Sequence, residues 1–153
     1  MSEGGRIVYA PIAGAAIGAD ATIDVWNLLG TSAIRIRLLG FELTSAAVAA
    51  ALTTLTLGFV STAGTGGSAV TEQHADDAKT TTILGALVTD VETPGTDAGR
   101  FMGWQWEQLG PVGHIWTPEM APVCAAAEGF SLVQTTAIAL TVSGFVCWEE
   151  IYV

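Results

Sequence analysis

The chain has 153 residues and a formal net charge of −10, and 50% of its residues are hydrophobic while only 13% are charged. Soluble domains usually carry about a quarter charged residues, so copies of the chain could cover part of its surface. The length suits one domain with a substantial core. Five basic residues against fifteen acidic ones cannot form a basic patch for a nucleic acid backbone. We therefore expect an acidic, self-associating domain that binds no nucleic acid.

Neither a secretory signal nor a membrane span is predicted. The first five residues lack a basic start that leads into an apolar run. Two long uncharged stretches, residues 43–71 and 129–148, are interrupted by polar residues and glycine, whereas a spanning helix needs about 20 predominantly apolar residues. Cys124 and Cys147 are too few for a disulfide framework, and we interpret them as buried thiols rather than a bridge. We expect the chain to fold in a cytoplasm and to bind no membrane.

Alternation of apolar and polar residues with a period of two predicts strands along most of the chain. In chain order the predicted strands are residues 6–12, 22–29, 33–39, 54–60, 81–89, 101–107, 130–136 and 139–148. The third, fourth and eighth have the clearest alternation. In the third, for example, Ile34, Ile36 and Leu38 face one side while Arg35 and Arg37 face the other.

About eight strands separated by turn-rich segments predict two packed antiparallel sheets, a β-sandwich of jelly-roll type. The alanine-rich segment 45–52 favours at most one short helix. Residues 72–79 are polar enough for an exposed loop or a helical turn. Small residues dominate the start of the chain, so we expect a flexible N-terminal arm over residues 1–19 and a single sandwich domain over residues 20–153.

No catalytic or cofactor-binding pattern stands out in the sequence. His74 and His114 are the only histidines, and neither has the spacing of a metal ligand; the His74 segment, with Asp76 and Asp77, is interpreted as a solvated loop. The glycine-rich residues 64–69 lack the lysine of a phosphate-binding loop, and no nucleophile elbow is present. We therefore predict no enzyme activity, no cofactor and no metal.

A small hydrolase or isomerase is the enzyme alternative that stays open. A glycosidase, for example, needs two carboxylates that face each other across a cleft. Candidates lie in the aromatic-rich second half of the chain: Glu107, Glu119, Glu128, Glu149 and Glu150. A chain with this many acids offers such candidates by chance.

Five tryptophans are many for this length, and two of them share one face of a predicted strand. Trp104 and Trp106 are two residues apart, so their rings form one apolar platform that can also donate hydrogen bonds. Such a platform suits core packing, a subunit interface or a carbohydrate-stacking surface. Trp116 is a further candidate for an interface or glycan contact. The sequence leaves these three interpretations open.

Three segments resemble small structural proteins of tailed bacteriophages: GTGGSAVT at Gly64–Thr71, GWQWE at Gly103–Glu107, and the closing stretch Pro122–Ile151. The resemblance implies a head decoration, or cement, protein. Such a protein binds the major capsid protein on the exterior of an icosahedral shell and clamps neighbouring capsomers. It is typically a homotrimer at local three-fold positions.

In that role the N-terminal arm would reach the capsid, with Arg6, Ile7 and Tyr9 as the candidate contact residues. An arm of this kind can add as a strand to the edge of a neighbouring sheet. The alternative is a virion module of a head fibre or tail that recognises host glycans through Trp104 and Trp106.

Overall fold

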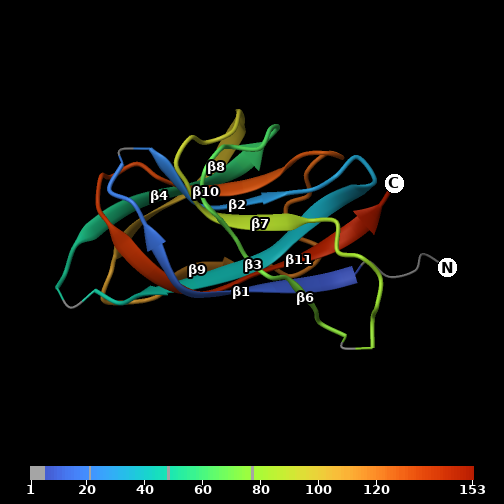
Figure 1. The fold of residues 1–153 in the computed structure, drawn as a ribbon, viewed down its shortest axis with the longest axis horizontal. Helices are drawn as coiled ribbons and strands as arrows, with labels where there is room; N and C mark the ends of the chain where they lie inside the picture. Colours follow the sequence, from blue (N-terminus) through green and yellow to red (C-terminus); the bar gives the residue numbers. More distant parts are fainter. Residues whose placement is uncertain (1–5, 21, 48, 77) are drawn as a thin grey trace.

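The computed structural model describes residues 6–20, 22–47, 49–76 and 78–153, and within these ranges every regular element is a β-strand. The strands form two antiparallel sheets that pack face to face as a sandwich (Figure 1). No described segment forms a helix that could span a membrane. The predicted all-β sandwich is therefore confirmed.

We call the five-stranded sheet sheet A, and its strands lie in the order β6-β1-β11-β3-β9. Its long members are β1, β11 and β3, which pair along most of their lengths. The bounds in this order are Gln73–His74, Arg6–Ile17, Leu140–Tyr152, Ile34–Ser45 and Val112–Ile115. The strand β11, the last in the sequence, therefore lies between β1 and β3, which are among the first.

Sheet B has six strands in the order β5-β7-β2-β10-β4-β8. Its bounds in this order are Ser68–Ala69, Ala86–Val91, Ile23–Leu29, Gly129–Gln134, Leu52–Val60 and Asp97–Glu107. The strand β10 pairs with both β2 and β4, so another late strand closes the middle of this sheet. All of these pairings are antiparallel.

All eight predicted strands coincide with strands of the structure, with corrected limits. The prediction for residues 81–89 began too early, because β7 starts only at Ala86. The short helix considered for residues 45–52 is not formed in the described part of that segment, since β3 runs to Ser45 and β4 begins at Leu52. The strands β5, β6 and β9 were not predicted.

Residues 6–17 of the predicted arm form β1, a strand inside sheet A rather than a free tether. Their partner is β11, with a register that runs from Arg6 opposite Glu150 to Ile17 opposite Leu140. Val8 and Ala10 are fully buried because the strand's inner face meets the core. The sandwich thus includes most of the predicted arm; residues 1–5 lie outside the described residues.

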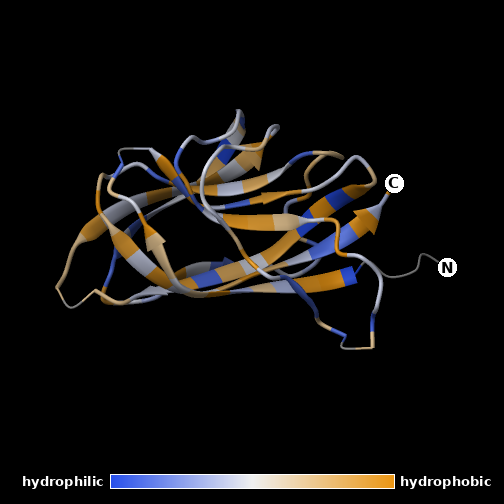
Figure 2. Ribbon diagram, in the orientation of Figure 1, coloured by the Kyte–Doolittle hydropathy of each residue, from blue (hydrophilic) through white to orange (hydrophobic). Residues whose placement is uncertain are grey.

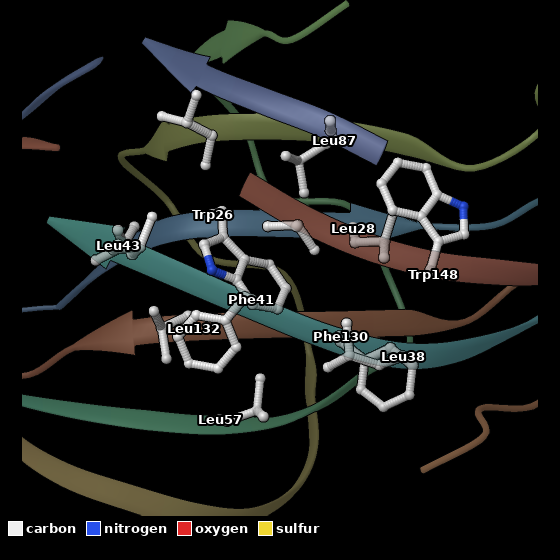
Figure 3. Packing of buried hydrophobic residues seen from close by; sticks show 14 of the residues in the cluster. Trp26, Leu28, Leu38, Phe41, Leu43, Leu57, Leu87, Phe130, Leu132 and Trp148 are labelled. Carbon is white, nitrogen blue, oxygen red and sulfur yellow. The ribbon is translucent and has the colours of Figure 1, made fainter. Parts of the chain in front are cut away.

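The core lies between the inner faces of the two sheets, as the alternation of hydrophobic and hydrophilic residues along the strands indicates (Figure 2). Trp26 of β2 and Phe41 of β3 meet edge to face across it, with ring centroids 5.6 Å apart. Trp148 and Phe130 fill the region beside Leu28 and Leu38 (Figure 3). These large side chains fix the spacing of the two sheets.

Candidate functional site

Trp104 and Trp106 lie on β8 and both face the inside of the sandwich. The ring of Trp104 is half-buried and meets Phe41 edge to face, at 5.4 Å between centroids. Trp106 is buried, and its indole Nε1 donates a hydrogen bond to the carbonyl oxygen of Gly110 at 2.7 Å. The shared face predicted from the sequence is correct, and it is the core face. Of the three interpretations left open, these contacts match core packing.

Trp116 lies just after β9 at the edge of sheet A. Its backbone N–H donates to the carbonyl oxygen of Leu39 at 2.9 Å, and its half-buried ring lies 4.6 Å from the ring of His114. The structure therefore does not gather Trp104, Trp106 and Trp116 into one exposed aromatic surface, because Trp106 is buried.

Arg6, Ile7 and Tyr9 are fixed by β1. The guanidinium of Arg6 lies 4.4 Å from the centre of the Tyr152 ring and donates to the carbonyl oxygen of Thr82 at 2.8 Å. Ile7 and Tyr9 point outward from sheet A and are 42% and 44% exposed. The three residues therefore belong to a paired strand and not to a flexible arm. Their contact with a capsid stays a prediction.

The outer face of sheet A carries an apolar row that crosses four strands. The register sets Tyr9 of β1 beside Cys147 of β11, Cys147 beside Gly40 of β3, and Gly40 beside Ile115 of β9. Ile115 is 62% exposed and lies over Gly40, where a Cβ would come within 2.4 Å of its Cδ1. We call these residues, with Phe145 next to Tyr9, the sheet A row. Within this row Tyr9 and Ile115 are exposed and Phe145 is partly exposed, whereas Cys147 and Gly40 are buried. Exposed apolar side chains gathered on one sheet face are typical of a contact surface.

An ion pair borders this row. Arg37 of β3 donates to Glu149 of β11 at 2.5 Å, and both side chains are partly exposed. The next residue, Glu150, faces inward and is fully buried, with Oε1 accepting from the backbone N–H groups of Leu84 and Gly85. Glu149 and Glu150 therefore point to opposite faces of β11 and do not form the facing pair that a glycosidase needs.

Sequence reasoning missed a polar cluster on the outer face of sheet B. Arg100 bonds to the backbone and hydroxyl oxygens of Ser131, both at 2.8 Å, and lies 3.3 Å from Asp97. Asp24 is fully buried nearby, and this burial raises the pKa of its carboxyl group from 3.8 to about 6. The hydrogen bond from Asn27 and the positive charge of Arg100 lower the pKa but do not outweigh the burial. These residues, except Asn27, line a cavity of about 460 Å³.

The two histidines and two cysteines form no reactive pair in the described residues. His74 Nε2 lies 2.7 Å from the carbonyl oxygen of Thr81, which ties β6 to the following loop. Cys124 and Cys147 are free and buried, as predicted. Within residues 6–20, 22–47, 49–76 and 78–153, no three acidic, histidine or cysteine side chains are placed to hold a metal ion.

A comparison with protein-family models, with curated proteins and with solved structures found no match to the chain.

Proposed function

We propose that the chain is a non-enzymatic structural protein that decorates the exterior of an icosahedral virus capsid, with the major capsid protein as its partner. The sheet A row carries this proposal. Tyr9, Phe145 and Ile115 present apolar surface on a sheet whose backbone is hydrogen-bonded across four strands. A rigid apolar face of this kind loses little conformational entropy when it docks, so many copies can each add a small stabilisation to a shell.

The fold type belongs to the proposal as well, since we infer that the sandwich is a jelly roll. In such a fold successive strands alternate between two four-stranded sheets. Here β1, β11, β3 and β9 lie in one sheet and β2, β10, β4 and β8 in the other. The chain passes between the sheets at each step along these eight strands except from β4 to β8. The short strands β5 and β6, together with β7, would then be additions at the edges.

The resemblance to small phage structural proteins supports the same role. All three resembling segments contribute strands to the sandwich, since Gly64–Thr71 contains β5, Gly103–Glu107 lies in β8, and the closing stretch contains β10 and most of β11. The glycan-binding alternative is less supported, because Trp104 and Trp106 direct their rings to the core rather than to solvent.

The direct test uses particles of the virus that encodes the chain. We expect mass spectrometry of purified particles to find the chain, and immunogold labelling to place it on the head. Particles made without it should bind the purified chain when it is added back. Absence from the particles, or failure of the added chain to bind them, would contradict the proposal.

Substitutions in the sheet A row test which face makes the contact. We expect Tyr9→Asp and Ile115→Asp to reduce the number of copies bound per particle at least tenfold, because each places an unpaired charge in an apolar contact. Leu52→Asp is the matched control, since Leu52 is 61% exposed at the start of β4 in the other sheet. Equal losses from all three variants would show that the row has no special role.

A further inference from the structure

The free edges of the two sheets differ in how well they are protected against pairing with another strand. Exposed edges are usually short, charged, bulged or interrupted by proline. In sheet A, β6 and β9 are only two and four residues long. Beyond β6, the edge of β1 carries Pro11 and a bulge between Ile12 and Ala15. In sheet B, β5 has two residues, whereas β8 has eleven.

The second half of β8 has none of the usual protections. The irregularities in its pairing with β4 lie before it, at the step from Met102 to Arg100 and around Gly99. From Met102 to Glu107 the register with β4 is regular, and Glu107 is the only charged residue. Among the described strands, this is therefore the longest regular edge that lacks proline.

The direction of the backbone groups on this edge follows from one hydrogen bond. The N–H of Gln108 donates to the carbonyl oxygen of Ala51 at 3.1 Å, which continues the β4 register past Leu52 opposite Glu107. In an antiparallel pair every second residue bonds to the partner. The even-numbered residues of β8 thus bond to β4, and Gly103, Gln105 and Glu107 direct their N–H and C=O groups to the free side.

These outward groups have few partners within the chain. In the part of the chain that the structure describes, no hydrogen bond outside the ladder with β4 involves the backbone N–H of Gly103 or Gln105, while the oxygen of Glu107 accepts from Gly110 at 3.1 Å. A hollow of about 530 Å³ lies along Trp104–Glu107 and is walled by residues 109–113. An extended strand is the occupant that could satisfy such a row of backbone groups.

We propose that this occupant is β8 of a second copy of the chain, paired antiparallel about a two-fold axis at Gln105. The two six-stranded sheets would then join into one continuous sheet. With this register Gln105 lies opposite itself, Gly103 opposite Glu107, and Trp104 opposite Trp106. Each Gln105 exchanges two backbone hydrogen bonds with its equivalent, and each Glu107 N–H donates to a Gly103 oxygen.

The edge is self-complementary in this register. Glu107, the one charge, meets a glycine, so no like charges oppose each other and no apolar side chain faces a carboxylate. An axis at Glu107 would oppose two carboxylates, and an axis at Trp104 would set Glu107 against Phe101; both are less favourable cross-strand pairs. A second copy therefore fits this edge without any change of sequence.

The test is the mass of the isolated protein, and it does not depend on the proposed function. Light scattering should give about twice the chain mass of 15.8 kDa. Gln105→Lys should halve that mass, because it places two ammonium groups directly opposite each other. Gln105→Pro should also halve it, because it removes the outward N–H and leaves the bonds to β4 intact.

Thr141→Lys is the matched control, with the same added charge on an exposed residue of β11 in the other sheet, and it should stay dimeric. Far-ultraviolet circular dichroism of each variant separates loss of pairing from loss of fold. A wild-type monomer or trimer would overturn the proposal, as would a dimer that persists in both folded Gln105 variants. The homotrimer implied by the phage resemblance is one of these outcomes.

Discussion

Asp24 shows how a single buried carboxyl group can make stability depend on pH. Its pKa is higher in the folded chain than the value of 3.8 expected when unfolded, so the folded form binds the proton more tightly. The stability that this group contributes is therefore full below about pH 4 and is lost as the pH rises through 6.

We expect Asp24→Asn to stabilise the protein relative to the wild type increasingly between pH 4 and pH 7. The gain above pH 7 should approach about 3 kcal/mol, from about 1.4 kcal/mol for each unit of pKa change. Urea denaturation of both proteins at several pH values measures it. A difference in the free energy of unfolding that is the same at pH 4 and pH 8 would contradict the assignment.

Glu150 is a buried acceptor that orders the segment before β7. Its Oε1 receives the N–H groups of Leu84 and Gly85, at 2.8 Å and 2.6 Å. Glu150→Ala should lower the free energy of unfolding by about 2–4 kcal/mol, because one buried and one part-buried donor lose their acceptor. Glu150→Gln keeps a carbonyl oxygen and should lose less. If the two variants are equally destabilised in guanidinium titrations, the acceptor role is wrong.

At the scale of the strand, Gly144 allows β11 and β3 to approach closely. Its φ is +150°, and a Cβ there would lie 1.9 Å from the carbonyl oxygen of Glu42 on β3. Gly144→Ala must either separate two paired strands or twist β11, and we expect a loss of about 3 kcal/mol or more in the free energy of unfolding.

Gly18→Ala provides the comparison for this substitution. A Cβ at Gly18 would make only ordinary contacts, the nearest at 3.5 Å from Asp20. We expect a change below about 1 kcal/mol there. Thermal melts of the two variants should therefore differ clearly, and similar melting temperatures would show that β11 tolerates the displacement.

The sequence predicts those strands that are long and bury one face. Ile34, Ile36 and Leu38 alternate with two arginines and are all fully buried, which confirms the predicted face of β3. The strands β5, β6 and β9 have two to four residues, too few for a period to appear. The opposite error concerned residues 13–17, whose small side chains give a weak local signal. They continue the strand because β11 pairs with Ala15, Ala16 and Ile17 beyond the bulge.

The candidate surface was predictable only in part. The alternation of side chains along β8 places Trp104 and Trp106 on the same face of the strand. Whether that face meets the core depends on where the second sheet lies. The sheet A row combines Tyr9, Cys147, Gly40 and Ile115, residues far apart in sequence that only the register of four strands brings together. No local pattern contains that information.

For the whole molecule, the two thiols report on the intact sandwich. Cys124 and Cys147 are 2% and 6% exposed, and burial raises the pKa of both. We expect both to react with a thiol reagent far more slowly in the native protein than in denaturant, where two thiols per chain should react rapidly. Rapid reaction of Cys147 under native conditions would show that sheet A opens locally at that position, and rapid reaction of Cys124 would show that its segment separates from Ile36 of β3.

The position of β11 also constrains how the chain can fold during synthesis. It follows the other ten strands named above, yet it lies between β1 and β3 and supplies the hydrogen-bond partners of both. Until it emerges from the ribosome, β1 and β3 present unpaired inner edges, and the inner face of sheet A lacks Trp148. Sheet A can therefore close only after translation has passed residue 152, and a chain truncated before Leu140 should remain unfolded and prone to aggregation.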